Sequence, residues 1–379
     1  MWLNRSKTRI MALGRIKELE LGEEQIPLDE ELDIDQVAEI ETRLLTRATE
    51  IRELKAQNPD PKMQRGQHPK QHGCLWAEFI VESNLPECIK VGLFKEAKLF
   101  PAWIRFSNAR TQDDSKPGAH GMSIKLMEVE GNKVLEDQRD SRTQDFILFD
   151  HPVFFIQNVK DYVLFDKELE KAFDKSPDAS PNLFEFIFSN FNPLNWRVRE
   201  ILILSALRSK KIGSPLETQY WSATPYALGS HAVKYFVKPS SKISSRTPLK
   251  TKDYLRDVMI ADLTGERKEV YFDFYVQIQT DPIKMPVEDP TIEWKKTKQY
   301  KVATIRIPPQ RFDSPEQMKF GENLSFTPWH ALLEHRPLGG INRARKEVYL
   351  RTSKLRHEKN EALPQEEPTP VTFSPSLLD

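Results

Sequence analysis

The sequence predicts an α+β protein in which an antiparallel β-sheet or barrel carries added helices. Several segments are short, rich in β-branched or aromatic residues and bounded by turn residues, as strands are. Longer and partly helical stretches lie between them, which favours this architecture. The predicted strands are WAEFIV (76–81), AWIRFS (102–107), GMSIKLMEV (121–129), AVKYFVKP (232–239), EVYFDFYVQIQ (269–279) and KQYKVATIRIP (298–308).

Residues 1–60 are charged and helical in character. Apolar residues follow a nearly helical stripe through this segment, at Val37, Ile40, Leu44, Leu45, Ile51 and Leu54. The sequence NPDP at 58–61 then breaks the helix. We interpret residues 1–60 as an N-terminal helical arm, and a subunit interface in a homo-oligomer is the role we expect for it.

Residues 61–360 are predicted to form one domain. Within it, VKDYVLFDKELEKAF (159–173) and WRVREILILSALRSKK (196–211) are predicted helices. Residues 361–379 are rich in proline and acid and have little apolar pattern, which predicts an extended or disordered C-terminal tail.

Composition and motif content narrow the function classes. Lys+Arg and Asp+Glu both total 56, so no net field favours nucleic acid or an anionic membrane. No apolar stretch has the length of a signal peptide or a membrane span, so we expect a cytoplasmic protein without an integral membrane segment. Cys74 and Cys88 lack the spacing of a disulfide framework or zinc site. Dinucleotide-binding, P-loop, serine-hydrolase and zinc-protease motifs are absent from the sequence.

The segment GGINRARKEVYLRTSKLRHEKN (339–360) carries the most informative pattern. As a helix it places Arg345, Tyr349 and Arg356 on one face, at spacings of four and seven residues. A free tyrosine has a pKa of about 10, and a neighbouring guanidinium favours its phenolate form. Tyrosine can be an axial ligand of haem iron. A basic surface helix with one tyrosine packed inward is the simpler alternative.

Two further segments combine basic side chains with groups that can transfer a proton. Arg65 lies three residues before His68, and Pro69 biases His68 towards an extended conformation ahead of a strand. Arg105 and Ser107 share one face of the predicted strand 102–107. If they are buried, the arginine needs a polar partner, and a carboxylate suits its fork.

The segment TQDFILFDHPVFFIQNVKDY (143–162) is rich in aromatic residues. Phe149, Phe154 and Phe155 are typical of a hydrophobic core, and they could also form the wall around a flat, apolar cofactor.

Taken together, these segments resemble the catalase family, and most of all its shorter relatives, the catalase-related peroxidases and hydroperoxide-converting haem enzymes. The resemblance spans roughly residues 62–360 and rests on the order and spacing of several motifs. The matching segments are residues 65–70 (RGQHPK), 104–107 (IRFS), 120–126 (HGMSIKL), 150–155 (DHPVFF) and the Arg345, Tyr349, Arg356 series. His72 is a rival to His68 in the first motif.

The resemblance implies that haem b is the cofactor and that Tyr349 binds its iron. It also implies roles for the other residues of the pattern. Arg345 stabilises the phenolate, and Phe149, Phe154 and Phe155 line the pocket. Facing the haem propionates are Arg65, Arg105 and Arg356.

On the opposite side of the haem, the resemblance makes His68 the acid and base, oriented by Ser107. Two departures weaken the match to catalases that disproportionate hydrogen peroxide. Asp150 stands where catalases have an asparagine, and an ionised carboxylate cannot donate a hydrogen bond. Gln67 stands where an apolar residue is usual.

The expected function is therefore that of a haem-dependent oxidoreductase acting on hydrogen peroxide or an organic hydroperoxide, of the catalase or peroxidase type. A fatty-acid hydroperoxide lyase or an isomerase resembling allene oxide synthase is the main alternative. A non-enzymatic haem carrier or sensor has less support, because a carrier does not need a histidine oriented by a serine.

Overall fold

Eight antiparallel strands close a barrel in the part of the chain that the computed structural model describes, residues 29–55, 62–175, 183–188, 196–240, 251–265, 269–361 and 367–370. Strand β5 pairs with both β4 and β7, and this pairing closes the ring. A further short strand, β6 (Tyr226–Leu228), forms a hairpin with β7. Around the barrel the order is β1 (Lys70–Val81), β2 (Leu99–Asn108), β3 (His120–Leu126), β4 (Gln144–Phe149), β5 (Tyr220–Trp221), β7 (His231–Pro239), β8 (Val270–Ile278) and β9 (Gln299–Ile307).

The barrel interior is a packed apolar core. Strand β8 alternates buried and half-buried residues, so Phe272 and Phe274 point inward as the period of two requires. Phe274 packs edge-on against Phe79 and Phe146, with ring centroids 5.1 and 4.9 Å apart. Strand β2 is buried over nearly its whole length. The predicted antiparallel barrel with added helices is confirmed.

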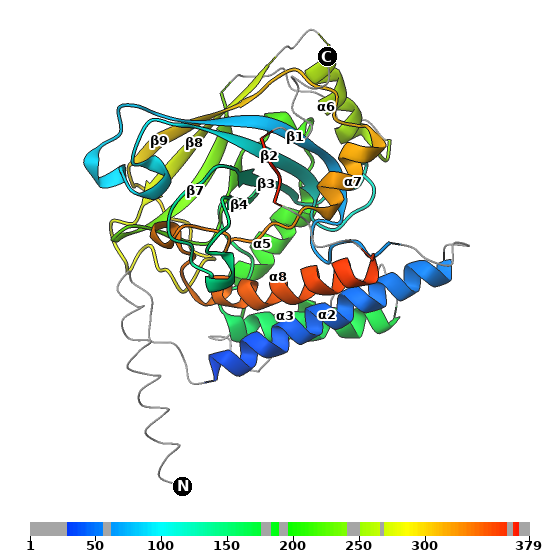
Figure 1. Ribbon diagram of the computed structural model, residues 1–379. Helices are drawn as coiled ribbons and strands as arrows, with labels where there is room; N and C mark the ends of the chain where they lie inside the picture. The colour runs from blue at the N-terminus through cyan, green and yellow to red at the C-terminus, as the bar shows by residue number, and fades with distance from the viewer. Residues whose placement is uncertain are drawn as a thin grey trace.

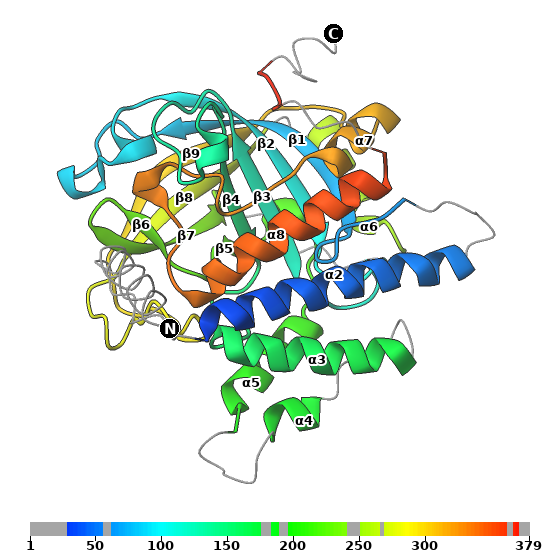
Figure 2. The ribbon, with the colours of Figure 1, turned by 60° about the horizontal axis from the view of Figure 1, so that its bottom comes forward.

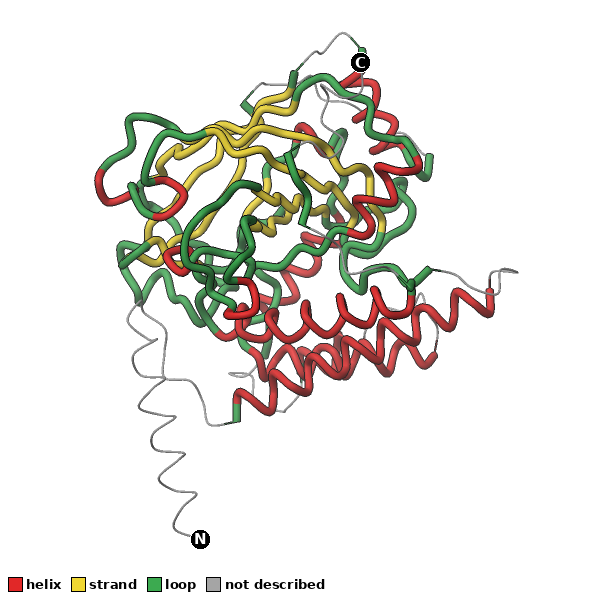
Figure 3. Tube along the Cα trace, in the orientation of Figure 1, coloured by secondary structure: helices red, strands yellow, loops and turns green. Residues whose placement is uncertain are grey.

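Three long helices lie side by side along one end of the barrel: α2 (Glu30–Lys55), α3 (Val159–Lys175) and α8 (Gly340–Lys359) (Figure 1). Turning the molecule shows α2 between the other two, with α5 (Val198–Ser209) and α4 (Leu183–Ile187) beyond α3 (Figure 2). Figure 3 separates this helical layer from the strands by colour. The predicted stripe residues Val37, Ile40 and Leu44 are buried here with Val348 of α8.

Ion pairs at both sides of α2 add to this apolar contact. Arg343 of α8 binds Glu30 at 2.6 Å, and Arg43 binds Glu170 of α3 at the same distance. Because one member of the first pair is nearly buried, that pair is shielded from water more than the exposed second pair. Helix α2 therefore packs as part of the helical layer, and residues 1–28 and 56–60 of the predicted arm lie outside the described residues.

The structure differs from the predicted elements at several places. Strand β1 begins at Lys70 rather than at 76, and β3 ends at Leu126 because Glu128 adopts a positive φ of 59°. Strand β4 occupies the first half of the aromatic segment 143–162, where no strand was assigned. Three helices were also not anticipated: α4, α6 (Tyr254–Thr264) and α7 (Pro315–Asn323).

Most of the predicted tail lies outside the described residues. Its described part, 367–370, contacts the domain through Glu367, which accepts hydrogen bonds from the hydroxyls of Ser141 and Thr143 at 2.6 and 2.8 Å. Among the helices of the described residues, none has the length and apolarity that crossing a bilayer demands.

Candidate functional site

Helix α8 presents Tyr349 towards the barrel. The Nη2 atom of Arg345 lies 3.3 Å from the hydroxyl of Tyr349, and its guanidinium carbon lies 5.4 Å from the ring centre. The other end of that guanidinium donates to Thr224 and Asn342, both at 3.1 Å. Burial alone would lower the pKa of Arg345, but the phenols of Tyr349 and Tyr226 outweigh it and raise the pKa. Arg345 is therefore a fixed, permanently charged support for Tyr349.

His68 lies in the bend that leads into β1. Its φ is positive, at 58°, so the predicted extended conformation of His68 is wrong. Its Nδ1 atom is 3.1 Å from the hydroxyl of Ser107, and its backbone N–H donates to the carbonyl of Ala109. Burial, followed by the nearby Arg105 charge, lowers the pKa of His68 to about 3. The imidazole is thus neutral at physiological pH and can accept a proton.

The position of the His68 ring depends on Gly121 in β3. A Cβ atom at Gly121 would lie 2.5 Å from two atoms of the ring and 3.1 Å from the Ser107 hydroxyl oxygen. Since that first distance is far below any real contact, the pairing of histidine and serine requires glycine there.

Three arginines from three elements converge on Glu322 of α7. The guanidiniums of Arg65 and Arg105 each contact its carboxylate at 3.1 Å, and Arg356 donates to its backbone carbonyl at 2.7 Å. Burial would raise the pKa of the Glu322 carboxyl, but Arg105 and Arg65 outweigh it and lower the pKa. Burial also lowers the pKa of Arg356 to about 10. Three positive charges therefore surround one negative charge.

These groups share a cavity of about 100 Å³ between α8, α2 and the barrel wall. Of the residues predicted from the sequence, five line it: Arg65, His68, Arg105, Tyr349 and Arg356. Ser107 and Arg345 lie behind the lining, in contact with His68 and Tyr349. The remaining lining residues are Glu41, Gly66, Gln67, Ser123, Ile147, Ser325, Phe326, Val348, Thr352 and Ser353.

Asp150 lies apart from this cavity. Its buried carboxylate binds His120 twice, through the backbone N–H at 3.0 Å and the ring Nδ1 at 2.8 Å. Lys210 adds an ion pair at 3.5 Å. Asp150 does not line the cavity, so its direct contact with a substrate there has no geometric support in this structure.

The three phenylalanines and the rival histidine also lie outside the cavity lining. Phe154 and Phe155 stack at 4.7 Å and pack against the helical layer, while Phe149 belongs to a neighbouring apolar cluster. His72 is fully buried, with its Nε2 atom 2.8 Å from the side-chain oxygen of Asn108. Of the two histidines, it is His68 that reaches the cavity.

Two carboxyl groups of the site escaped the sequence analysis. Glu322 lies on α7. The sequence does signal the start of this helix, because Ser314 is an N-cap residue and Pro315 lies in the first turn. Glu41 lies on α2, only 3% exposed, and accepts from Gln67 and Tyr162 at 3.4 Å each. Burial raises the pKa of Glu41. The sequence signal available for Glu41 was its place as an acidic residue beside Ile40, within the apolar stripe of the predicted helix.

The barrel and its helices are similar to solved catalase structures. A fungal catalase aligns with 83% of this chain and 64% of its own, at a TM-score of 0.61 and 15% identity. Catalase A from Saccharomyces cerevisiae gives a TM-score of 0.61 at 17% identity, over 83% of this chain and 66% of the other. A bacterial catalase gives a TM-score of 0.57 at 15% identity, over 84% of this chain and 63% of the other.

The fold is catalase-like. The chain covers less than two thirds of the length of each of these three catalases. Because the sequence identity is low, the similarity concerns the fold alone. No protein-family model matches the chain, and no curated protein matches it in sequence. Within the described residues, no group of three or more His, Cys, Asp or Glu side chains is arranged to hold a metal ion.

Proposed function

We propose that this chain is a haem-dependent oxidoreductase that cleaves the O–O bond of hydrogen peroxide or an organic hydroperoxide. One observation carries the proposal: a single cavity is lined by a phenol backed by a guanidinium, a neutral histidine held by a serine, and three converging arginines. The catalase-like fold supports it, since the same kind of barrel and helices occurs in catalases.

The residues of the cavity fit haem b in charge and in donor type. Three guanidiniums around the one Glu322 carboxylate leave an excess of two positive charges in the cluster, and haem b carries two propionates. Burying such charges unpaired is costly, so an anionic group belongs there. The cavity of about 100 Å³ is smaller than the ~300–1,000 Å³ of typical cofactor sites, so its walls have to widen when the group enters.

In this proposal the chain's own residues would hold the cofactor through its iron and its propionates. The hydroxyl oxygen of Tyr349 would hold the iron, with the guanidinium of Arg345 beside it. Arg65, Arg105 and Arg356 bind the propionates. When bound, haem supplies a redox-active iron at which a peroxide bond can break.

His68 moves the proton in this proposal. Because its ring is neutral, it can take the proton of a hydroperoxide and return it to the leaving oxygen. The Ser107 hydroxyl fixes the orientation of the ring. Asp150 binds His120 outside the cavity lining and does not contact the hydroperoxide in this proposal.

The test is an absorption spectrum of the haem-loaded full chain before and after peroxide is added. We expect a high-spin ferric spectrum that changes with peroxide, and we expect Tyr349→Phe to lose or shift it. Tyr300→Phe, which alters a half-buried tyrosine outside the cavity, is the matched control. Unchanged haem affinity, spectrum and turnover in Tyr349→Phe would refute the assignment.

The same experiment separates the candidate substrates. Rapid gas release from hydrogen peroxide identifies a catalase, whereas loss of the diene band of linoleate hydroperoxide with little gas identifies a lipid hydroperoxide enzyme. Binding of haem without any turnover would leave a carrier or sensor. Failure to bind haem at all would refute the proposed function as a whole.

A further inference from the structure

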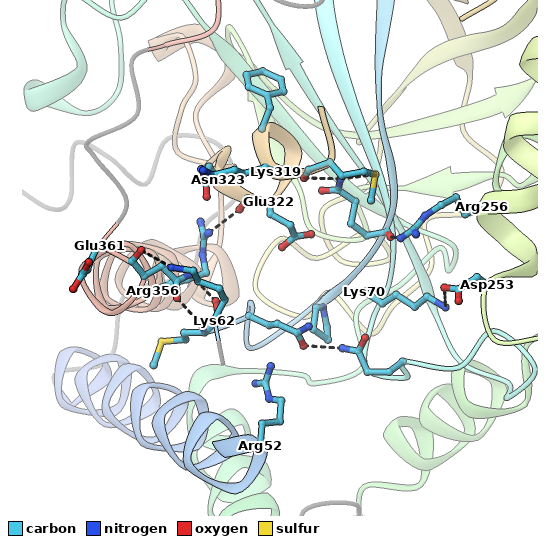
Figure 4. Close-up of a pocket in the computed structure, with 18 residues that line it drawn as sticks. Arg52, Lys62, Lys70, Asp253, Arg256, Lys319, Glu322, Asn323, Arg356 and Glu361 are labelled. Carbon is cyan, nitrogen blue, oxygen red and sulfur yellow. Dashed lines mark hydrogen bonds and ion pairs between the residues drawn. The ribbon is translucent and has the colours of Figure 1, made fainter. Parts of the chain in front are cut away.

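A second and much larger cavity opens beside the first. Its volume is about 1140 Å³, and α2, α6, α7, α8 and the segment before β1 all contribute to its lining. Figure 4 shows its labelled polar side chains arranged around one common space. We call it the cationic basin and define it by its charged residues, which are Arg52, Lys62, Lys70, Arg256, Lys319, Arg356, Asp253, Glu322 and Glu361.

The basin carries an excess of positive charge. Six cationic side chains line it against three carboxylates, whereas the chain as a whole has no formal net charge. Two of the three carboxylates already have cationic partners. Glu322 is bound by Arg65 and Arg105, and Asp253 lies 3.1 Å from Lys70. The excess is therefore concentrated on the remaining cations of the basin.

Those cations have no carboxylate partner among the described residues. Arg256 donates to the carbonyls of His72 and Gln71 at 3.0 and 2.8 Å, and Lys62 donates to the carbonyl of Asn360 at 3.3 Å. A carbonyl oxygen satisfies a donor but does not neutralise its charge. Arg356 likewise donates to a backbone carbonyl.

Arg52 gives the sharpest indication of a missing partner. Its Nε atom donates to the carbonyl of Ala48 at 3.0 Å, but its buried Nη1 atom has no hydrogen-bond partner in the described part of the chain. Burial lowers the pKa of Arg52, because removal from water disfavours its charge. An anion beside the guanidinium would give the Nη1 atom a hydrogen-bond acceptor and would stabilise the positive charge of Arg52.

The basin also has an apolar part. Met63, Pro69, Met318 and Phe320 line it alongside the charged groups. Sites for small organic molecules combine apolar surface with convergent polar groups, and the basin has both. An inorganic ion would use the cations and leave this surface without a contact.

We propose that the cationic basin binds an organic anion, with a carboxylate or phosphate group held by Arg52, Lys62 and Lys319 and an apolar body against Met318 and Phe320. The inference does not rest on the proposed haem chemistry, because it concerns a separate cavity. The two cavities do share Arg356, so an occupant of the basin lies next to the arginine cluster.

Isothermal titration calorimetry on the full chain tests this with three probes: laurate, lauryl phosphate and inorganic phosphate. We expect at least one of the two dodecyl anions to bind, more weakly at higher salt, because the cations are partly exposed. Inorganic phosphate should bind at least tenfold more weakly. Equal affinity for inorganic phosphate would refute the claim that the ligand is organic. Failure of all three probes to bind would refute the claim that the basin is an anion-binding site.

The variant Lys62→Gln/Lys319→Gln removes two exposed cations whose loss should not disturb folding. We expect about tenfold weaker binding of the preferred dodecyl anion, as two partly exposed ion pairs of ~0.5–1 kcal/mol each would give. Arg52→Gln should also weaken it. Lys95→Gln/Arg139→Gln, at exposed cations outside the basin, is the control and should bind as the wild type does. Unchanged binding in both basin variants would refute the proposal.

Discussion

The two adjoining cavities differ in how their chemistry is fixed. The narrow cavity, about 100 Å³, is lined by groups that each have a defined neighbour, such as His68 on Ser107 and Tyr349 on Arg345. The cationic basin, about 1140 Å³, has room but few fixed partners for its cations. The first arrangement suits chemistry at particular atoms, whereas the second suits binding by charge and apolar contact.

This difference explains why the two cavities should respond differently to mutation. A small shift of one group in the narrow cavity breaks a pairing, so its effect on turnover should be large. Removal of one cation from the basin leaves several others, so its effect should be modest and dependent on salt. The predictions below test that contrast.

The largest effect is expected from Gly121→Ala. The added Cβ would meet the His68 ring at 2.5 Å and push it off Ser107. Peroxide turnover should fall about a hundredfold or more, since general acid–base catalysis contributes roughly 10²–10⁴-fold. Laurate binding to the basin should not change. Gly118→Ala, where the added Cβ meets only Thr111 at an ordinary 3.6 Å, is the control in steady-state assays. Equal activity in the two variants would show that His68 is not needed.

Glu322→Gln should have the next largest effect, because the Glu322 carboxylate lies between two guanidiniums. Loss of its charge leaves Arg65 and Arg105 repelling each other. We expect a loss of about 1–2 kcal/mol in the free energy of unfolding, less than the ~3–5 kcal/mol of a fully buried pair. Urea unfolding at low and high salt measures it, and the loss should shrink with salt. Glu316→Gln, exposed on the same helix, should change little.

Glu41→Gln should give a smaller effect that depends on pH. The pKa of Glu41 is raised by burial, so its folded form is favoured while protonated, and that contribution is lost as pH rises through the raised pKa. The glutamine variant should gain about 1 kcal/mol relative to wild type at alkaline pH and nothing at acid pH. Thermal unfolding across pH measures this, with the exposed Glu39→Gln as control. A constant difference across pH would contradict a titrating Glu41.

The smallest change is expected from acidification of the narrow cavity. Because the pKa of His68 is about 3, the ring stays neutral and able to take a proton well below neutrality. Turnover per folded, haem-loaded molecule should therefore stay nearly constant from about pH 8 to pH 5, where an ordinary histidine of pKa ~6.5 would have titrated. Initial rates across that range test this. A fall in rate centred near pH 6.5 would mean that His68 is exposed to solvent during turnover.

The sequence by itself indicated six of the eight barrel strands, because these strands carry their own pattern, whereas β4 and β5, through which the ring closes, were not predicted. The alternation in β8 follows from the period of two that a barrel with an apolar interior imposes. The same holds for α8, where spacings of four and seven place Arg345, Tyr349 and Arg356 on one face. These are local regularities, and a local pattern can be recognised without knowing what the segment packs against.

Only the tertiary structure decided which charged groups meet. Glu322 is separated from Arg105 by 217 positions, and nothing in the local pattern of α7 indicates that its carboxylate lies between two arginines. Asp150 turned towards His120, because β3 and β4 are paired and bring those residues together. The cationic basin is built from five separate segments whose charges cancel in the chain total. Charge proximity of this kind depends on distances in space, which the order of residues does not contain.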